Sequence, residues 1–204
     1  MTLEERGFEL MSDGLRLEAR LHEGDGRLAA AVLHPHPQYG GDMDNHVVMA
    51  VCEALAEAGV TTLRFNFRGT GASEGSYDDG RGEACDARAA IVALRALTSD
   101  APVLLAGYSF GAMVAAAVAT DSELAGLALI SPPLSMAGLP ALPEKLPVLV
   151  MAGDRDAISP AREVLALASD QVRAVAVPGA DHGWWPGIDA LKAEMLAFER
   201  RMAL

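Results

Sequence analysis

The pattern of hydrophobic and polar residues changes near residue 28. Before this point, short apolar runs such as 15–21 (Leu-Arg-Leu-Glu-Ala-Arg-Leu) alternate with polar residues, and turn-forming residues such as Ser12-Asp-Gly14 separate the runs. A period of two is typical of a half-buried strand, and a short polar turn between two such runs favours a hairpin. We therefore expect an antiparallel pair of strands at one edge of a sheet.

From residue 28 onward, continuous apolar runs alternate with amphipathic stretches. The continuous runs indicate parallel strands buried on both faces, and the amphipathic stretches indicate the helices that cover them. The segment 131–146 contains four prolines and favours no helix. The expected strands are 28–33, 61–67, 102–106, 126–130, 147–151 and 173–177, and the expected helices are 46–58, 83–97, 110–119, 160–168 and 188–202.

This order predicts an α/β fold, with a mostly parallel, doubly wound sheet, helices on both faces and antiparallel strands at the N-terminal edge. No repeat, low-complexity tract or linker interrupts the pattern, so residues 1–204 are expected to form a single domain. The 51% content of hydrophobic residues excludes a disordered chain.

Charge and composition narrow the expected partners. A formal net charge of −12 surrounds the protein with a negative field, which disfavours binding to nucleic acid and to anionic membranes. A neutral or cationic small molecule is a better candidate for the binding partner, and the oligomeric state stays open.

Cys52 and Cys85 lie in helix-like stretches, where buried thiols are the simplest interpretation. The N-terminus shows no signal-peptide pattern and no apolar run approaches the roughly 18 residues of a membrane helix, so a cytoplasmic location is expected.

The most informative motif is Gly107-Tyr108-Ser109-Phe110-Gly111, which lies between a strand-like run and a helix-like run. A serine nucleophile at a sharp turn leaves no room for β-carbons two residues on either side, which explains the two glycines. An alternative is a serine that only caps the following helix.

Residues that could act together with a serine nucleophile follow two later strands. Gly153-Asp-Arg-Asp156 comes after the expected strand 147–151, and Asp181-His182-Gly183 comes after the strand 173–177. Because the carboxyl ends of parallel strands meet at one edge of a sheet, these groups are expected to lie near Ser109. Serine, then aspartate, then histidine is the chain order of the α/β-hydrolases.

The sequence resembles the α/β-hydrolases over essentially its full length, in particular the small lidless bacterial hydrolases near dienelactone hydrolase. The motifs that carry this resemblance are the serine turn, the Gly-x-x-Asp segment, the histidine near the end, His34-Pro-His-Pro-Gln-Tyr-Gly-Gly41 and Arg64-Phe-Asn-Phe-Arg-Gly-Thr-Gly71. The resemblance implies the α/β-hydrolase fold and a catalytic apparatus, but it supplies no substrate.

The expected catalytic residues are Ser109 as nucleophile, His182 as general base and Asp156 as the acid that orients the imidazole. The family pattern of Gly-x-x-Asp followed by proline selects Asp156, with Pro160 in the expected place, and leaves Asp154 as a turn or loop-capping residue.

An oxyanion hole needs two backbone N–H groups. Phe110 is expected to supply one. Alignment of the loop after the first parallel strand with the usual pattern makes Gln38 the best second donor and Tyr39 the next.

Two further interpretations concern neighbouring residues. His34, His36, Asp42, Asp44 and His46 could form a zinc site, but the loop's prolines and the resemblance favour an oxyanion loop held by the histidines, with no metal. Trp184 and Trp185 could line a substrate pocket or pack against the last helix.

The resulting hypothesis is a serine hydrolase, a carboxylesterase for short or compact acyl esters or lactones, that needs no cofactor. Only residues 131–146 are available for a cap, so the site should be a shallow, open cleft. Two alternatives stay open: an amide or peptide hydrolase with the same three residues, and a catalytically silent binding protein of this fold.

Overall fold

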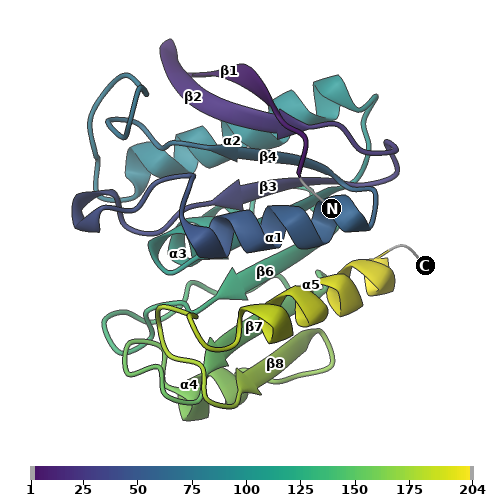
Figure 1. Cartoon of the computed structure of the whole chain (residues 1–204). Coiled ribbons are helices and arrows are strands. Elements are labelled where there is room, and N and C mark those ends of the chain that lie inside the picture. Colours follow the sequence, from purple (N-terminus) through teal and green to yellow (C-terminus); the bar gives the residue numbers. More distant parts are fainter. Residues whose placement is uncertain (1–2, 203–204) are drawn as a thin grey trace.

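All eight strands of the described chain belong to one sheet, in the order β1-β2-β4-β3-β5-β6-β7-β8 (Figure 1). The computed structural model describes residues 3–202. At one edge, β1 (Arg6–Ser12) pairs antiparallel with β2 (Leu15–His22), which pairs antiparallel with β4 (Thr61–Phe65). The other neighbours pair in parallel and comprise β3 (Ala29–Leu33), β4, β5 (Val103–Tyr108), β6 (Gly126–Ile130), β7 (Val148–Gly153) and β8 (Val172–Val177).

Helices cover both faces of this sheet. The helices α1 (His46–Glu57) and α5 (Ile188–Met202) lie side by side in front of the sheet in Figure 1. The opposite face is covered by α2 (Arg81–Leu97), α3 (Phe110–Val118) and the short α4 (Ala161–Leu165). A short 3-10 helix, η1 (Pro37–Tyr39), lies in the loop between β3 and α1.

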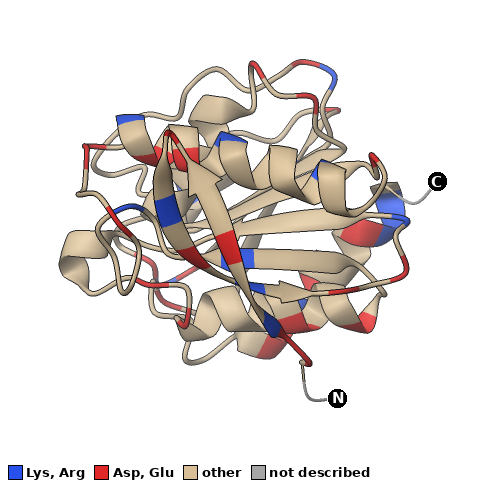
Figure 2. Ribbon diagram, turned by 90° about the horizontal axis from the view of Figure 1, so that it is seen from above, with Lys and Arg blue, Asp and Glu red and all other residues tan. Residues whose placement is uncertain are grey.

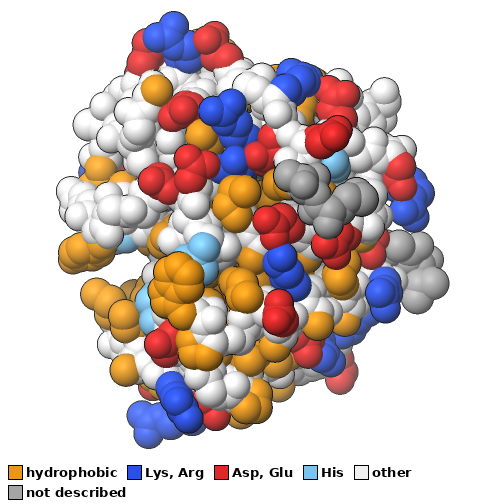
Figure 3. All heavy atoms as spheres, viewed as in Figure 1, with side chains coloured by type: hydrophobic (Ala, Val, Ile, Leu, Met, Phe, Trp, Pro, Cys, Tyr) orange, Lys and Arg blue, Asp and Glu red, His pale blue; other side chains and the backbone are white. Residues whose placement is uncertain are grey.

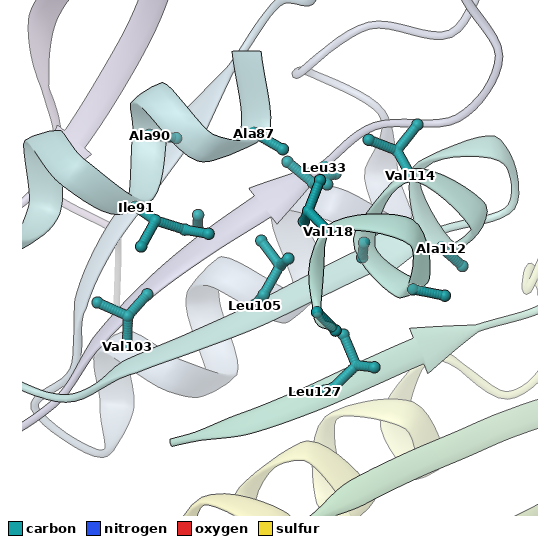
Figure 4. Close-up of a cluster of buried hydrophobic side chains, with 14 of the residues drawn as sticks. Leu33, Ala87, Ala90, Ile91, Val103, Leu105, Ala112, Val114, Val118 and Leu127 are labelled. Carbon is teal, nitrogen blue, oxygen red and sulfur yellow. The ribbon is translucent and has the colours of Figure 1, made fainter. Parts of the chain in front are cut away.

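The central strands are buried on both faces, which explains why their sequences are continuous apolar runs. Every residue of β3, β5, β6 and β7 is buried, and their side chains divide between two hydrophobic clusters, one on each face of the sheet. Small residues from α2 and α3 let these helices pack closely on the strands. Figure 4 shows part of this packing, formed by Leu33, Ala87, Ala90, Ile91, Val103, Leu105, Ala112, Val114, Val118 and Leu127.

The predicted fold class is confirmed, including the antiparallel edge and the absence of a cap between β6 and β7. Some boundaries differ for local reasons. The fourth strand ends at Phe65 because the N–H of Phe67 donates to the His34 ring instead of continuing the ladder. Helix α2 begins two residues earlier than expected, because the Glu83 carboxylate accepts the N–H groups of Asp78 and Gly80 at its start.

The predicted helix 160–168 is shorter than expected. Pro160 caps α4, and the regular helix ends at Leu165 because the N–H groups of Leu167 and Ala168 bind carbonyl groups three residues back. The segment 131–146, where no helix was predicted, forms only turns and irregular chain.

Charged residues are spread over strands, helices and loops in the view of Figure 2, with basic residues placed among the acidic ones. Cys52 is buried, Cys85 is half-buried, and both are free thiols. Within residues 3–202, no helix is long and apolar enough to cross a membrane.

Candidate active site

Ser109 lies at a sharp turn between β5 and α3. Its backbone φ is 54° and its ψ is −115°, a combination that residues with side chains rarely adopt. A β-carbon at Gly107 would lie 2.2 Å from the carbonyl oxygen of Gly111, and one at Gly111 would lie 2.5 Å from that of Leu33. Both separations are too short for any real contact, so the tight passage of the chain requires both glycines.

A chain of hydrogen bonds joins Ser109, His182 and Asp156. The Oγ atom of Ser109 lies 3.1 Å from Nε2 of His182. On the other side of the imidazole, Nδ1 lies 2.9 Å from Oδ2 and 3.1 Å from Oδ1 of Asp156. Because an ionised carboxylate only accepts hydrogen bonds, Nδ1 carries the proton and Nε2 can accept one from the serine hydroxyl. The three residues predicted from the sequence therefore meet in an arrangement that can activate a serine nucleophile.

The environment of Asp156 keeps its carboxylate ionised. Its side chain is fully buried, and Oδ1 also accepts the backbone N–H groups of Ile158 at 2.9 Å and Ser159 at 2.8 Å. Burial alone would raise the pKa of Asp156, but the hydrogen bonds from His182 and Ser159 outweigh that effect and hold the pKa below its usual value. The negative charge can therefore orient His182 and stabilise its protonated form.

The neighbouring carboxylate, Asp154, is engaged in the adjacent loop. Its Oδ1 atom accepts the N–H of Gly179 at 2.8 Å, in the turn that follows β8. This contact fits the predicted loop-capping role of Asp154 and leaves Asp156 as the carboxylate beside His182.

Ser109 and His182 line a cleft of about 560 Å³ at the carboxyl ends of the parallel strands. The loop after β3 forms one wall, with Tyr39, and the segment after β6 forms the other, with Met136. Figure 3 shows an indentation bordered by hydrophobic side chains at this edge, on the left of the view. A larger cavity of about 800 Å³ lies beside α4, and neither Ser109 nor His182 lines it.

The loop after β3 folds around His36 in a way that the sequence did not reveal. The N–H of Gln38 donates to Nδ1 of His36 at 3.2 Å, and the N–H of Tyr39 donates to the His36 carbonyl at 3.1 Å. Both predicted second donors are therefore already bound within η1 and its cap. Among residues 3–202, the N–H groups of His36 and Phe110 have no hydrogen-bond acceptor, and both residues line the cleft. Of the N–H groups in this loop, that of His36 is therefore free to bind a ligand oxygen, whereas those of Gln38 and Tyr39 are already engaged.

The other histidines of this region serve separate structural contacts. His34 is buried; its Nδ1 donates to the Pro35 carbonyl at 2.6 Å, and its Nε2 accepts the N–H of Phe67 at 3.0 Å. Burial lowers the pKa of His34 to about 4, so its ring is neutral at neutral pH. Over residues 3–202, no three His, Cys, Asp or Glu side chains gather closely enough to hold a metal ion.

Two hydrogen bonds hold the backbone of the turn that carries His182. The hydroxyl of Tyr108 donates to the His182 carbonyl at 2.6 Å, and burial raises the pKa of Tyr108 to about 12, so the donor proton is retained. The Nε2 atom of His46, at the start of α1, lies 2.6 Å from the Gly183 carbonyl. The sequence analysis named Tyr108 in the serine motif and His46 in a possible zinc site, but it did not predict these contacts, because neither residue has a known spacing from the His182 turn.

The paired tryptophans beside His182 have different environments. Trp184 is fully buried among the residues that pack against α5, and its indole N–H donates to Oγ of Ser131 at 2.9 Å. Trp185 is exposed and stacks on His46, with ring centroids 4.1 Å apart and an interplanar angle of 13°. Neither ring lines the cleft, so packing, the second of the two predicted roles, describes Trp184.

The geometry agrees with the comparison to known families. The model of a family described as an alpha/beta hydrolase domain matches residues 29–195. The chain belongs to the α/β-hydrolase family. This α/β-hydrolase is 35% identical to an alpha-beta serine hydrolase homologue from Coxiella burnetii, with a TM-score of 0.86 and 97% of each chain covered. It is 31% identical to a serine hydrolase without a lid from Xanthomonas campestris, with a TM-score of 0.88, covering 98% of this chain and 96% of the other.

Curated relatives of this α/β-hydrolase include an uncharacterized protein from Rickettsia prowazekii that is 40% identical over 143 residues, or 66% of this chain. An uncharacterized protein from Mycobacterium tuberculosis is 35% identical over 169 residues, or 70% of this chain. The aligned part spans 59% of the length of each of these two relatives.

Proposed function

We propose that this protein is a serine hydrolase that cleaves carboxylic esters through an acyl-enzyme intermediate. The observation that carries the proposal is the series of hydrogen bonds from Ser109 through His182 to Asp156. Ser109 lies at a strained turn, and both Ser109 and His182 line a cleft. Membership of the α/β-hydrolase family and the similarity to serine hydrolases support it.

In the first half of the proposed reaction, Nε2 of His182 takes the hydroxyl proton as Oγ of Ser109 attacks the ester carbonyl carbon. The carbonyl oxygen gains a negative charge, which the N–H groups of Phe110 and His36 stabilise. His182 then gives its proton to the departing alkoxide, and the acyl group stays on Ser109. Asp156 stabilises the imidazolium while it exists.

In the second half, water replaces the alcohol. His182 removes a proton from the water as its oxygen attacks the acyl-enzyme, and the same two N–H groups stabilise the new oxyanion. Collapse releases the carboxylic acid, and His182 returns a proton to Oγ of Ser109. The reaction consumes one water for each ester and requires no metal or organic cofactor.

The shape of the site favours short or compact acyl groups. The segment 131–146 adds no helix over the cleft, so an extended acyl chain would leave most of its length in water. Each methylene that stays exposed contributes less than the roughly 0.8 kcal/mol of full burial. We therefore place soluble, monomeric esters or lactones ahead of long-chain lipids as substrates.

A panel of purified substrates tests this function. It contains p-nitrophenyl acetate, a small lactone and p-nitroacetanilide, each assayed with the wild-type protein and with Ser109→Ala. The proposal expects turnover of the ester or lactone above that of the anilide, and a loss of roughly 10³-fold or more in Ser109→Ala. Turnover of the anilide alone would indicate an amidase, and ester turnover within tenfold of wild type in Ser109→Ala would contradict the mechanism.

A further inference from the structure

Two exposed side chains border the cleft on loops that are far apart in the sequence. Tyr39, in η1, is 83% exposed, and Met136, in the segment after β6, is 74% exposed. Both line the cleft that contains Ser109, and their loops follow β3 and β6, the strands on either side of β5 in the sheet. An isolated apolar side chain at a surface is ordinary, but two on the facing walls of one reactive cleft form a contact surface for a ligand.

Three aromatic rings, including that of Tyr39, pack around His36 on one wall of the cleft. The ring centroid of His36 lies 4.8 Å from that of Tyr39, 4.8 Å from that of Phe110 and 5.0 Å from that of Tyr77. Both nitrogens of His36 are also occupied, one by the N–H of Gln38 and the other by the hydroxyl of Tyr77 at 3.2 Å. The His36 ring cannot rotate without breaking these bonds, so it gives the neighbouring Tyr39 ring a fixed surface to pack on.

The facing wall and the floor contribute thioether groups. Met136 lies on the wall after β6, together with Pro133, and Met113 of α3 lies beside Phe110. A methionine sulfur makes favourable contacts with aromatic rings, and its unbranched side chain adapts to the ring that it meets. A flat ring bound between the two walls would therefore contact aromatic carbon on one side and sulfur on the other.

The side chains that line the cleft determine whether the bound ring can carry a charged substituent. Among the described residues that line the cleft there is no Lys, Arg, Asp or Glu. A carboxylate on the ring would lose hydration without gaining an ion pair, and the net charge of −12 adds a repulsive field. An uncharged ring meets neither penalty.

We propose that the cleft contains a subsite for an uncharged aromatic ring of the substrate, between Tyr39 and Met136. The inference rests on the proposed ester hydrolysis at Ser109 and narrows its substrate to compact aryl-bearing esters. The ring occupies the space between the two walls, and the ester carbonyl lies at Ser109.

Three methyl esters test the subsite: methyl phenylacetate, methyl cyclohexylacetate, which has nearly the same size, and methyl para-carboxyphenylacetate, which adds a charged group to the ring. Each kcat/KM is divided by the alkaline hydrolysis rate constant of the same ester, which removes differences in intrinsic reactivity. The phenyl ester should exceed the cyclohexyl ester by roughly tenfold and the carboxyphenyl ester by more than about a hundredfold. A cyclohexyl ester that is hydrolysed equally well, or a well-accepted carboxylate, would overturn the subsite.

Variants locate the ring between the two walls. Tyr39→Leu and Met136→Ala should each lower the phenyl-to-cyclohexyl ratio toward about one, whereas Met11→Ala, at an exposed methionine of β1 away from the cleft, should leave the ratio unchanged. A ratio that survives both cleft substitutions would show that the ring binds elsewhere. Failure to hydrolyse any ester, including p-nitrophenyl acetate, would instead contradict the proposed function itself.

Discussion

Replacing Asp156 by asparagine changes which ring nitrogen of His182 carries the proton. The substitution preserves the size of the side chain at position 156. In the native protein, both carboxylate oxygens lie within 3.1 Å of Nδ1, so Nδ1 is the protonated nitrogen. An asparagine can keep its oxygen on the N–H groups of Ile158 and Ser159, which are 2.9 and 2.8 Å from Oδ1. Its NH₂ group then faces Nδ1 as a donor. The imidazole must accept at Nδ1 and carry its proton on Nε2, where it cannot take the proton of Ser109.

The magnitude follows from the loss of two effects. The wrong tautomer removes the general base, and the missing negative charge leaves the imidazolium unsupported in a buried environment. In a well-studied serine protease the same change lowers kcat by roughly 10⁴, and we expect a decrease of roughly 10³ to 10⁴, or about 4 to 5.5 kcal/mol of transition-state stabilisation. The free energy of unfolding should change little, because the two backbone N–H groups keep an acceptor.

The assay is the kcat for p-nitrophenyl acetate in the wild type, Asp156→Asn and Asp154→Asn, with thermal unfolding followed by circular dichroism. Asp154→Asn is the matched control, since its Oδ1 accepts the N–H of the nearby Gly179 and an asparagine oxygen can replace it. We expect the control to stay within about tenfold of wild type. Equal losses in the two variants, or a larger loss in Asp154→Asn, would refute the assignment of the acid.

Three other predictions concern stability, acyl length and metal. Burial lowers the pKa of His34 to about 4, so between about pH 6.5 and pH 4 its ring binds a proton in the unfolded state but not in the folded state. The free energy of unfolding should therefore fall by roughly 3 kcal/mol as the pH is lowered from 6.5 to 4. Urea unfolding of the wild type and of His34→Gln across this pH range measures the effect. The free energy of unfolding should fall by that much more in the wild type than in His34→Gln, and equal decreases in the two proteins would refute the prediction. Across acyl chains of two to sixteen carbons, kcat/KM should peak at short lengths without a jump at an oil-water interface, and a peak at the long end would show that another element covers the site. Dialysis against a strong chelator should leave turnover unchanged, whereas stoichiometric zinc with chelator-sensitive turnover would restore the metal hypothesis.

Much of the fold could be predicted because the local pattern and the tertiary structure agree. The strands β3 and β5 are buried at every position because helices cover both of their faces, and their mostly apolar sequences therefore predict this burial. The glycines at 107 and 111 could be recognised because only a missing β-carbon permits the approach of the chain at the serine turn. Element ends were less predictable, as α2 shows, because the Glu83 cap depends on side-chain contacts across a turn.

The oxyanion loop shows where sequence reasoning reached its limit. Pro35 and Pro37 carry no N–H and cannot be donors, but the sequence could not show that η1 would engage the N–H groups of Gln38 and Tyr39. That outcome depends on the path of a loop in three dimensions. The same holds for His46, whose contact with the Gly183 carbonyl joins residues 137 positions apart.

The central claim is that Ser109 is a nucleophile activated by His182. Its most direct test is covalent labelling of the purified protein by a fluorophosphonate, followed by mass spectrometry of the intact chain and of its peptides. We predict one adduct per chain on Ser109 and none in Ser109→Ala, with labelling slowed by several orders of magnitude in His182→Ala. A wild-type protein that stays unlabelled, or an adduct on another residue that persists in Ser109→Ala, would contradict it.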